Sequence, residues 1–387
     1  MKDVKIVIGA NYGDEGKGLM TRHFVLQAKA NHTTPIVVFH NGTAQRGHTV
    51  DYSADFRHVY HHFGSGTGDG APTFFAKTFL IHPMEFRREM CEELIPAGII
   101  PPICYCDPEA KVITPLDMVV DHATEEHIAI LQGDREYGSC GYGSWCAAED
   151  RIPMGRTAFT VADFANADKM NGIPFLMDQI WNDCLGILIK RGVDLEKSPY
   201  FRHLLDDRTH LIRNFIQDFR FFLSHVKFIS FDDLWKTTDS FVFENGQGLG
   251  LDMNVDNDWH TTSNTGLTNP IAMLGDKQDF SAEACYVTRS YLTRHGVGPM
   301  ENRAPKTEIN SLMIDKTNVP NDFQGSLRYG FLGDAEQSAR IIKDFTPVMG
   351  DTRFKFEFAV THTNEFDCGN DVTKYFSDNP YEVKERK

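Results

Sequence analysis

The sequence predicts an α/β protein: a single large domain, residues 1–387, built on a central, mostly parallel β-sheet flanked by helices. Three observations favour this class. Residues 4–8, 35–40 and 241–243 are short runs rich in β-branched or aromatic side chains, as in strands buried on both faces. Each run ends in a polar loop that contains glycine, which is where open parallel sheets place their chemistry. Residues 16–29 and 83–94, between such runs, are predicted helices.

Composition excludes several classes of protein. The formal net charge of −15 argues against a general nucleic-acid binder, because such proteins neutralise phosphates with clustered Lys and Arg. No apolar run approaches the length of a membrane span and no signal-peptide pattern precedes residue 4, so we expect a cytoplasmic protein, in the host cytoplasm if it is viral. The eight cysteines include no C-x-x-C pair, so neither a zinc ribbon nor a disulfide framework is expected.

A mainly helical insertion is expected at about residues 160–235. Apolar side chains recur at helical spacing through residues 211–223 and predict a strongly amphipathic or buried helix. No chemical motif stands out between residues 172 and 235, so this apolar stripe is interpreted as core and not as a platform for base stacking.

The first strand leads into a loop that carries four glycines, two carboxylates and a lysine. Its glycines, Gly9, Gly13, Gly16 and Gly18, allow the backbone N–H groups to approach an anion, and the following helix adds the positive end of its dipole. The usual phosphate-loop pattern is not met, because Asn11 and Gly18 stand where a glycine and a Ser or Thr are required.

Asp14 is therefore the candidate to hold Mg²⁺, and a carboxylate beside phosphates can also accept a proton. The structural alternative for this loop is a glycine-rich turn with a surface Lys17.

Two further polar loops follow predicted strands. His48 lies between Gly47 and Thr49 after the second strand, a position that suits catalysis better than a place on an apolar helix face. Gln247, after the strand of residues 241–243, has an amide that can both donate to and accept from a purine edge. A glycine-spaced loop, residues 139–144, offers N–H groups and the hydroxyl of Ser139 to a second phosphate.

In sequence order these motifs resemble adenylosuccinate synthetase, the ligase that joins aspartate to C6 of a 6-oxopurine nucleotide. Residues 13–18 look like its signature loop, residues 47–49 like its second motif, and residues 246–248 like its Glu-Gly-Ala-Gln-Gly motif. Residues 290–299 are similar to its Tyr-Ser-Thr-Arg-Val-Gly-Ala-Gly-Pro stretch, so the resemblance runs from residue 9 to residue 330. It implies the synthetase fold, with a core like that of P-loop NTPases.

The resemblance also implies roles for individual residues. Asp14 removes the N1 proton of the purine, His48 is the acid, and Lys17 and Gln247 complete the catalytic set, with Mg²⁺ held by Asp14 and Gly47. Residues implied to bind nucleotide or phosphate are Asn11, Gly13, Glu15, Gly16, Gly18, Gln45, Gly47, Thr49, Ser139, Cys140, Arg156, Thr261, Val297, Gly298 and Asn364. Ser326 and Arg328 are implied to bind aspartate, and Arg156 implies a homodimer because it would reach the nucleotide of the partner subunit.

Several positions depart from the family pattern. Gln45 and Arg46 replace an asparagine and an alanine, Tyr142 replaces an arginine, and only Arg328 remains of a run of arginines that clamps aspartate. Asn364 stands where an aspartate reads guanine, and its amide suits adenine better, which predicts ATP as donor.

These departures favour the virus-associated branch that joins aspartate to (d)GMP with ATP, giving 2-amino-(deoxy)adenylosuccinate, ADP and phosphate. The alternative is the ordinary reaction of IMP, aspartate and GTP. An alternative of another class is a nucleotide-dependent switch protein. Neither nucleic acid nor a membrane is an expected partner.

Overall fold

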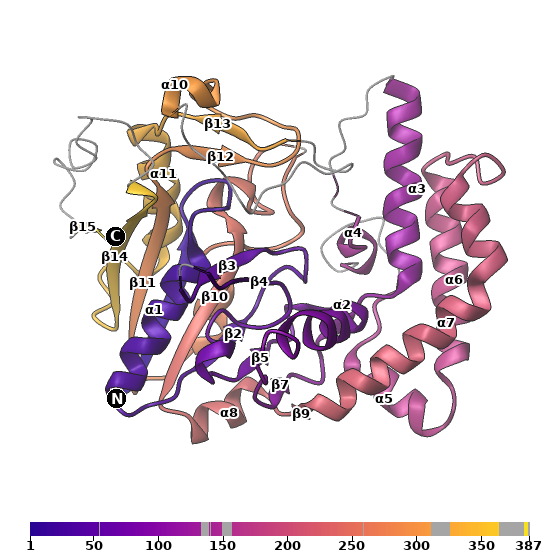
Figure 1. Ribbon diagram of the computed structural model, residues 1–387, viewed down its shortest axis with the longest axis horizontal. Helices are drawn as coiled ribbons and strands as arrows, with labels where there is room; N and C mark the ends of the chain where they lie inside the picture. Colours follow the sequence, from indigo (N-terminus) through magenta and orange to yellow (C-terminus); the bar gives the residue numbers. More distant parts are fainter. Residues whose placement is uncertain are drawn as a thin grey trace.

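The computed structural model describes residues 1–53, 55–132, 139, 141–148, 157–257, 259–310, 326–363 and 383–385. Figure 1 shows two regions side by side, a β-sheet with its covering helices and a group of long helices that includes α3, α6 and α7. No helix in the described ranges combines the length and the apolar character needed to cross a membrane.

A nine-stranded sheet forms the centre of the described chain, in the order β15-β14-β11-β1-β10-β2-β5-β7-β9, and every neighbouring pair is parallel. The predicted parallel α/β sheet is confirmed. Its strands are β1 Lys2–Gly9, β2 Ile36–Phe39, β5 Thr73–Phe75, β7 Cys104–Cys106, β9 Val226–Phe228, β10 Ser240–Gly248, β11 Phe280–Arg289, β14 Phe354–Thr361 and β15 Val383–Glu385. Short two-stranded pairs join β3 His48–Asp51 to β4 Arg57–Tyr60, β6 Leu80–Ile81 to β8 Lys111–Val112, and β12 Leu292–Arg294 to β13 Arg328–Gly330.

Side chains of β1 alternate between two hydrophobic layers. Val7 packs into the layer that contains Met20 and Phe24 of α1, whereas Ile6 and Ile8 pack into the opposite layer, and the side chains of all three strand residues are fully buried. This alternation is the period-two geometry of a strand covered on both faces.

The described helices are α1 Lys17–Ala30, α2 Pro83–Arg88, α3 Pro115–Gln132, α4 Ser144–Ala147, α5 Val161–Lys169, α6 Ile173–Lys190, α7 Pro199–His225, α8 Phe231–Thr237, α9 Thr268–Leu274, α10 Lys306–Asn310 and α11 Asp334–Phe345. Short 3₁₀ turns lie at Thr67–Asp69, Leu249–Leu251 and Thr346–Val348. The predicted helix at residues 83–94 changes character at Glu89, because Glu89–Leu94 forms a π-helical turn. There the buried Glu89 carboxylate accepts hydrogen bonds from the backbone N–H groups of His61 and His62.

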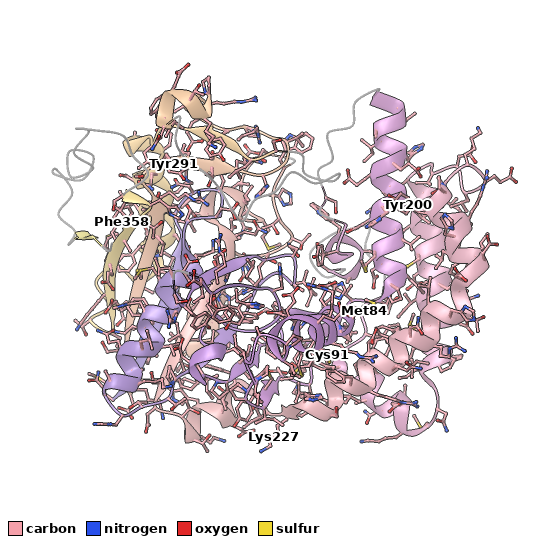
Figure 2. The ribbon with its side chains drawn as sticks, viewed as in Figure 1. Met84, Cys91, Tyr200, Lys227, Tyr291 and Phe358 are labelled. Carbon is pink, nitrogen blue, oxygen red and sulfur yellow. The ribbon has the colours of Figure 1, made fainter. Side chains whose placement is uncertain are left out.

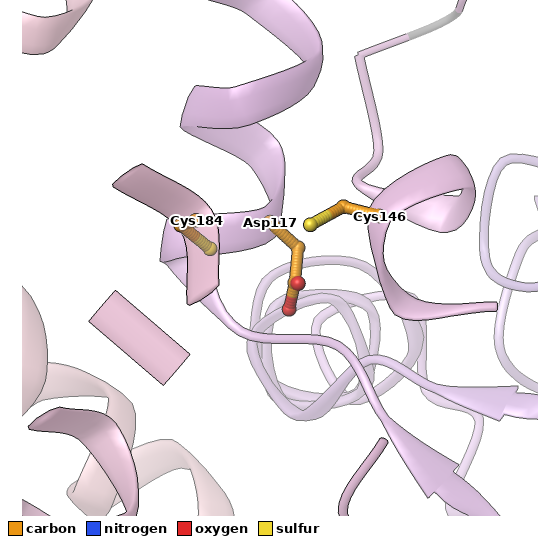
Figure 3. A group of neighbouring side chains, drawn as sticks. All are labelled: Asp117, Cys146 and Cys184. Carbon is orange, nitrogen blue, oxygen red and sulfur yellow. The ribbon is translucent and has the colours of Figure 1, made fainter. Parts of the chain in front are cut away.

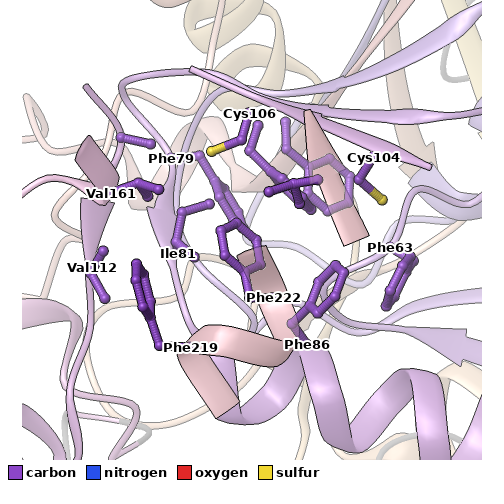
Figure 4. Close-up of a cluster of buried hydrophobic side chains, with 14 of the residues drawn as sticks. Phe63, Phe79, Ile81, Phe86, Cys104, Cys106, Val112, Val161, Phe219 and Phe222 are labelled. Carbon is purple, nitrogen blue, oxygen red and sulfur yellow. The ribbon is translucent and has the colours of Figure 1, made fainter. Parts of the chain in front are cut away.

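Aromatic side chains join the helical region to the sheet. Phe219 and Phe222 of α7 lie in one buried cluster with Phe86 of α2 and Cys106 of β7 (Figure 4). The rings of Phe86 and Phe222 meet edge to face at 5.1 Å. The amphipathic pattern of residues 211–223 is therefore core, as its spacing predicted.

Tyr200 connects α7 to α3 at the outer end of the helical region (Figure 2). Its ring meets that of His122 of α3 edge to face at 4.9 Å. The position of α3 matters for function, because this helix forms one wall of the site described next.

Candidate active site

The loop between β1 and α1 has a backbone shape that its glycines allow. Gly13, Asp14 and Gly16 all have positive φ, at 99°, 58° and 88°. A side chain on Gly16 would also meet Thr361, at 2.8 Å from an added Cβ. Aspartate is one of the few residue types besides glycine that adopt this region of φ readily, so the loop accommodates Asp14 between its glycines.

Glu15 and Asn11, two residues predicted to bind nucleotide or phosphate, stabilise the loop from its buried side. Glu15 is buried, and its carboxylate accepts a hydrogen bond from the backbone N–H of Asn11 and lies 3.9 Å from Lys17 Nζ. The Asn11 amide donates to Thr288 Oγ1 at 2.9 Å and accepts from Arg340 at 2.6 Å. Burial raises the pKa of Glu15 to about 7, against the opposing charge of Lys17. Glu15 and Asn11 thus shape the loop from its buried side.

Asp14 is paired with a histidine that the sequence motifs did not indicate. His295 Nε2 lies 3.2 Å from Asp14 Oδ2, and Arg289 donates to the backbone carbonyl of Asp14. Burial acts to raise the pKa of Asp14, but the hydrogen bond and charge of His295, helped by Arg289 and Lys17, outweigh it and lower the pKa to about 2. Asp14 is therefore a carboxylate at neutral pH.

His48 begins β3 and is held from behind by Glu244 of β10. Its Nδ1 lies 2.6 Å from Glu244 Oε1, and the Glu244 carboxylate also accepts from the backbone N–H of Ser65 at 3.0 Å and from the Ser65 hydroxyl. Burial acts to raise the pKa of Glu244, yet the adjacent His48 and the Ser65 donors lower it overall. Burial lowers the pKa of His48 to about 4, against the pull of Glu244.

A signal for Glu244 exists in the sequence. It is a carboxylate directly after the apolar run of residues 241–243, and a charge on a buried strand requires a partner. His295 lies inside the 290–299 motif but has no comparable signal.

Gln247 lies at the carboxyl end of β10 with φ of 63°. Its side chain faces the phosphate loop, since a Cβ added to Gly13 would lie 3.6 Å from Gln247 Oε1. Gln247, whose amide is predicted to contact a purine edge, therefore lies next to the predicted phosphate loop.

A cavity of about 730 Å³ brings the four predicted catalytic residues together: Asp14, Lys17, His48 and Gln247 all line it. The predicted binding residues that also line it are Gly13, Gln45, Gly47, Ser139, Thr261 and Val297. The same cavity is also bordered by Tyr12, Arg46, Val59, His61, Leu251, Arg294, His295 and Gly296. The wall formed by α3, α4, the C-terminus of α6 and the loop before Thr261 adds Asp121, Thr124, Glu125, His127, Ile128, Ser144, Trp145, Arg191, Trp259 and His260.

Other predicted residues lie outside this lining within the described chain: Asn11, Glu15, Gly16, Gly18, Thr49, Gly298, Ser326 and Arg328. Gly18 and Thr49 pack α1 against β3, since a Cβ on Gly18 would lie 2.7 Å from the Thr49 carbonyl oxygen. Ser326 is exposed, and Arg328 donates to the Gly298 carbonyl at 2.9 Å. Cys140, Arg156 and Asn364 lie outside the described residues.

Arg46, which departs from the family pattern, supports the wall of the cavity. Its guanidinium lies 3.9 Å from the centre of the Phe39 ring and donates to the Glu244 backbone carbonyl at 3.0 Å. Burial lowers the pKa of Arg46 to about 10, against the opposing charges of Glu244 and Glu89. Arg46 therefore remains positively charged at neutral pH, beside the pair formed by His48 and Glu244.

In the loop of residues 139–144, three backbone N–H groups donate hydrogen bonds to neighbouring side chains of the protein. The N–H groups of Ser139 and Gly143 donate to Glu125 and Asp121 of α3, at 3.0 and 2.8 Å, and that of Gly141 to Ser139 Oγ at 3.1 Å. The Ser139 hydroxyl lies 3.3 Å from Asp121 Oδ2. Because these N–H groups already donate to the protein itself, binding a phosphate at this wall would require a positively charged side chain in addition to the loop.

A separate buried cluster combines Asp117, Cys146 and Cys184, whose ligand atoms lie within 4.8 Å of one another (Figure 3). Asp117 Oδ2 accepts from the N–H and hydroxyl of Thr114, at 2.7 and 2.8 Å. These bonds link Asp117, in the first turn of α3, to Thr114, the residue that precedes this helix. We interpret the cluster as packing between α3, α4 and α6.

Comparison with known proteins agrees with this geometry. The family model "Adenylosuccinate synthetase" matches residues 6–330. The chain belongs to the adenylosuccinate synthetase family. The family predicted from its motifs is thus confirmed.

Curated relatives of the synthetase family are distant. The adenylosuccinate synthetase of Thermosipho africanus is 23% identical over 313 residues, which cover 77% of this chain and 66% of the relative. That of Clostridium botulinum (strain Alaska E43 / Type E3) is 26% identical over 301 residues, which cover 76% of this chain and 64% of the relative. The chain thus spans about two thirds of the length of these relatives.

Two solved structures share the synthetase fold. The fully ligated adenylosuccinate synthetase of Plasmodium falciparum superposes with a TM-score of 0.63 at 16% identity, over 92% of this chain and 76% of that one. The cyanophage S-2L succinoaminodeoxyadenylate synthetase (PurZ), bound to dGMP and dATP as an energy donor, gives 0.53 at 12% identity, over 93% and 84%. Likeness at these identities concerns the fold alone.

Proposed function

We propose that this chain is a nucleoside-triphosphate-dependent ligase that joins L-aspartate to C6 of a 6-oxopurine nucleoside monophosphate through a 6-phosphoryl intermediate. The observation that carries the proposal is the meeting of Asp14 and His48 in one cavity, beside Lys17 and Gln247. The carboxylate of Asp14 is ionised at neutral pH, and His48 is backed by a buried carboxylate, so the pair can take a proton and stabilise negative charge on one ring.

Asp14 accepts the N1 proton of the purine, so that O6 becomes nucleophilic and attacks the γ-phosphorus of the donor. Its low pKa makes it a weak base, so Lys17 and His48 must stabilise the charge that develops on O6. His48 can donate to O6 only through a protonated Nε2, because its Nδ1 faces Glu244. Negative charge on O6, together with Glu244, favours that imidazolium. The amine of aspartate then displaces phosphate from C6.

Magnesium fits the donor set of this loop. Asp14 supplies a hard, ionised carboxylate, and Gly47, whose backbone carbonyl is the second proposed ligand, borders the same cavity; carboxylate and carbonyl oxygens are ligands that Mg²⁺ prefers. When bound there, the ion would neutralise charge on the donor phosphates.

For the substrates, we propose (d)GMP and ATP, giving 2-amino-(deoxy)adenylosuccinate. The altered Gln45 and Arg46, the reduced arginine run at Arg328 and the amide of Asn364 support this choice. The fold is shared both with a phage enzyme whose structure holds dGMP and dATP and with an adenylosuccinate synthetase, so the choice of substrates rests on these residues and not on the fold. IMP with GTP is the alternative pair. Ser326 and Arg328 remain proposed contacts of aspartate, and Arg156 the proposed contact across a homodimer.

A phosphate-release assay tests the proposal. The protein is incubated with Mg²⁺, ATP or GTP, aspartate, and IMP, GMP or dGMP in each combination. The proposal predicts release that requires both aspartate and a monophosphate, and is fastest with ATP and GMP or dGMP. Release that needs neither would favour the nucleotide-dependent switch, and preference for IMP with GTP would favour the ordinary synthetase.

A further inference from the structure

Three arginines line the cavity within the described chain, and they differ in how their guanidinium groups are used. Arg46 donates to the backbone carbonyls of Asn41 and Glu244. Arg294 donates to those of Val297 and Pro299 at 3.2 and 2.7 Å and packs on the Tyr12 ring. Both therefore fix the wall of the cavity.

Arg191 is placed differently. It caps the C-terminus of α6 in the helical region, is half-buried, and lines the cavity beside α3. Among the residues that the structure describes, its guanidinium donates to one side chain, the Thr124 hydroxyl of α3, at 3.0 Å. A guanidinium has five N–H donors, so Arg191 can bind an anion in the cavity while Thr124 orients it.

Ser139 belongs to the same part of the wall. Its hydroxyl donates to Asp121. Burial raises the pKa of Asp121 to about 7, although the Gly143 N–H, the charge of Arg191 and the Ser139 hydroxyl act to lower it, so this carboxyl is partly protonated at neutral pH. Asp121 therefore repels an anion at this wall less strongly than a fully ionised carboxylate would.

We propose that Arg191 binds the 5′-phosphate of the acceptor nucleotide, with Thr124 as its positioning residue. This inference rests on the proposed function for the choice of ligand. A purine whose O6 and N1 face His48 and Asp14 must direct its phosphate away from the reacting centre, toward another wall of the cavity. The amine of aspartate must instead reach C6. The anion at the α3 wall is thus the phosphate monoester and not a carboxylate of aspartate.

Binding measurements separate this role from a structural one. The affinity for dGMP, GMP and IMP, and for the nucleosides deoxyguanosine, guanosine and inosine, is measured by titration calorimetry or by tryptophan fluorescence, since Trp145 and Trp259 border the cavity. For the monophosphate that binds best, Arg191→Gln is expected to weaken affinity about 10- to 100-fold and to leave the matching nucleoside unchanged. Arg191→Lys, which keeps the charge, should lie between the two.

Arg213→Gln is the matched control, because Arg213 is exposed on α7 and does not line this cavity. It should bind the monophosphate like the wild type. The inference would be overturned if Arg191→Gln lost affinity equally for nucleotide and nucleoside, or lost none. It would also be overturned if the wild type bound no monophosphate, or if the variant showed a higher KM for aspartate with unchanged nucleotide affinity. A wild type that binds monophosphate through Arg191 but shows no aspartate-dependent turnover would instead refute the proposed function alone.

Discussion

Glu244 Oε1 lies 2.6 Å from His48 Nδ1, although 196 residues separate the two side chains in sequence. The contact forms because β10 carries Glu244 to the carboxyl edge of the sheet, where the loop after β2 brings His48. Two donations from Ser65 complete the environment of the carboxylate. We therefore propose that Glu244 orients His48 and stabilises its protonated form during the reaction.

Glu244→Gln is expected to reduce kcat roughly 10- to 1,000-fold, because a neutral amide cannot stabilise the imidazolium of His48. The measurement is steady-state phosphate release, with circular dichroism to verify the fold. Glu283→Gln makes the same chemical change in β11, where Glu283 pairs with Lys5 at 3.0 Å, and should leave kcat unchanged. Equal rates in Glu244→Gln and wild type would contradict the role of Glu244.

Asp14→Asn and His48→Asn are each expected to lower turnover by about 10²- to 10⁴-fold while the protein stays folded. Asparagine keeps the approximate size of each side chain but removes the proposed base in one case and the proposed acid in the other. Single-turnover assays with all substrates present provide the measurement. Near-wild-type rates in either variant would refute the assignment of that residue.

The titration of Asp121 is expected to contribute a loss of stability as pH rises from about 4 to about 7. The pKa of this carboxyl is raised by burial from 3.8 to about 7, so across that window the folded state binds a proton that the unfolded state has lost. Asp121→Asn removes this titration. The melting temperature of the variant should therefore rise relative to that of the wild type as the pH is raised from 5 to 7.5, and an identical pH dependence in both proteins would contradict this contribution of Asp121.

Asn364→Asp is expected to move the donor preference from ATP toward GTP. A carboxylate accepts from both N1–H and the 2-amino group of guanine, whereas the amide of Asn364 offers one acceptor. The measurement is the ratio of kcat/KM for the two donors, and an unchanged ratio would mean that other residues read the base.

Local patterns were sufficient to predict the sheet and the main motif residues. Residues 4–8 have the composition of a doubly covered strand, and the glycines around Asp14 permit the positive φ values that the loop adopts. Because strands of a parallel sheet end at one edge, loops that follow β1, β2 and β10 meet there, which brings Asp14, His48 and Gln247 to one cavity.

Contacts between distant segments were beyond the sequence patterns. His295 beside Asp14, Glu244 behind His48 and Arg191 on the α3 wall each depend on how remote elements pack, and none has a local period or spacing that specifies its partner. The resemblance predicted that Glu15 and Asn11 bind nucleotide or phosphate, whereas their contacts in this structure support the loop.

The central claim is that O6 of the purine becomes an oxygen of the released phosphate. The direct measurement uses GMP, dGMP and IMP labelled with ¹⁸O at O6, with aspartate, Mg²⁺ and ATP or GTP, and mass analysis of the inorganic phosphate. Our account predicts one ¹⁸O atom in each phosphate formed during turnover. Unlabelled phosphate, formed while the label stays in the nucleotide, would contradict it.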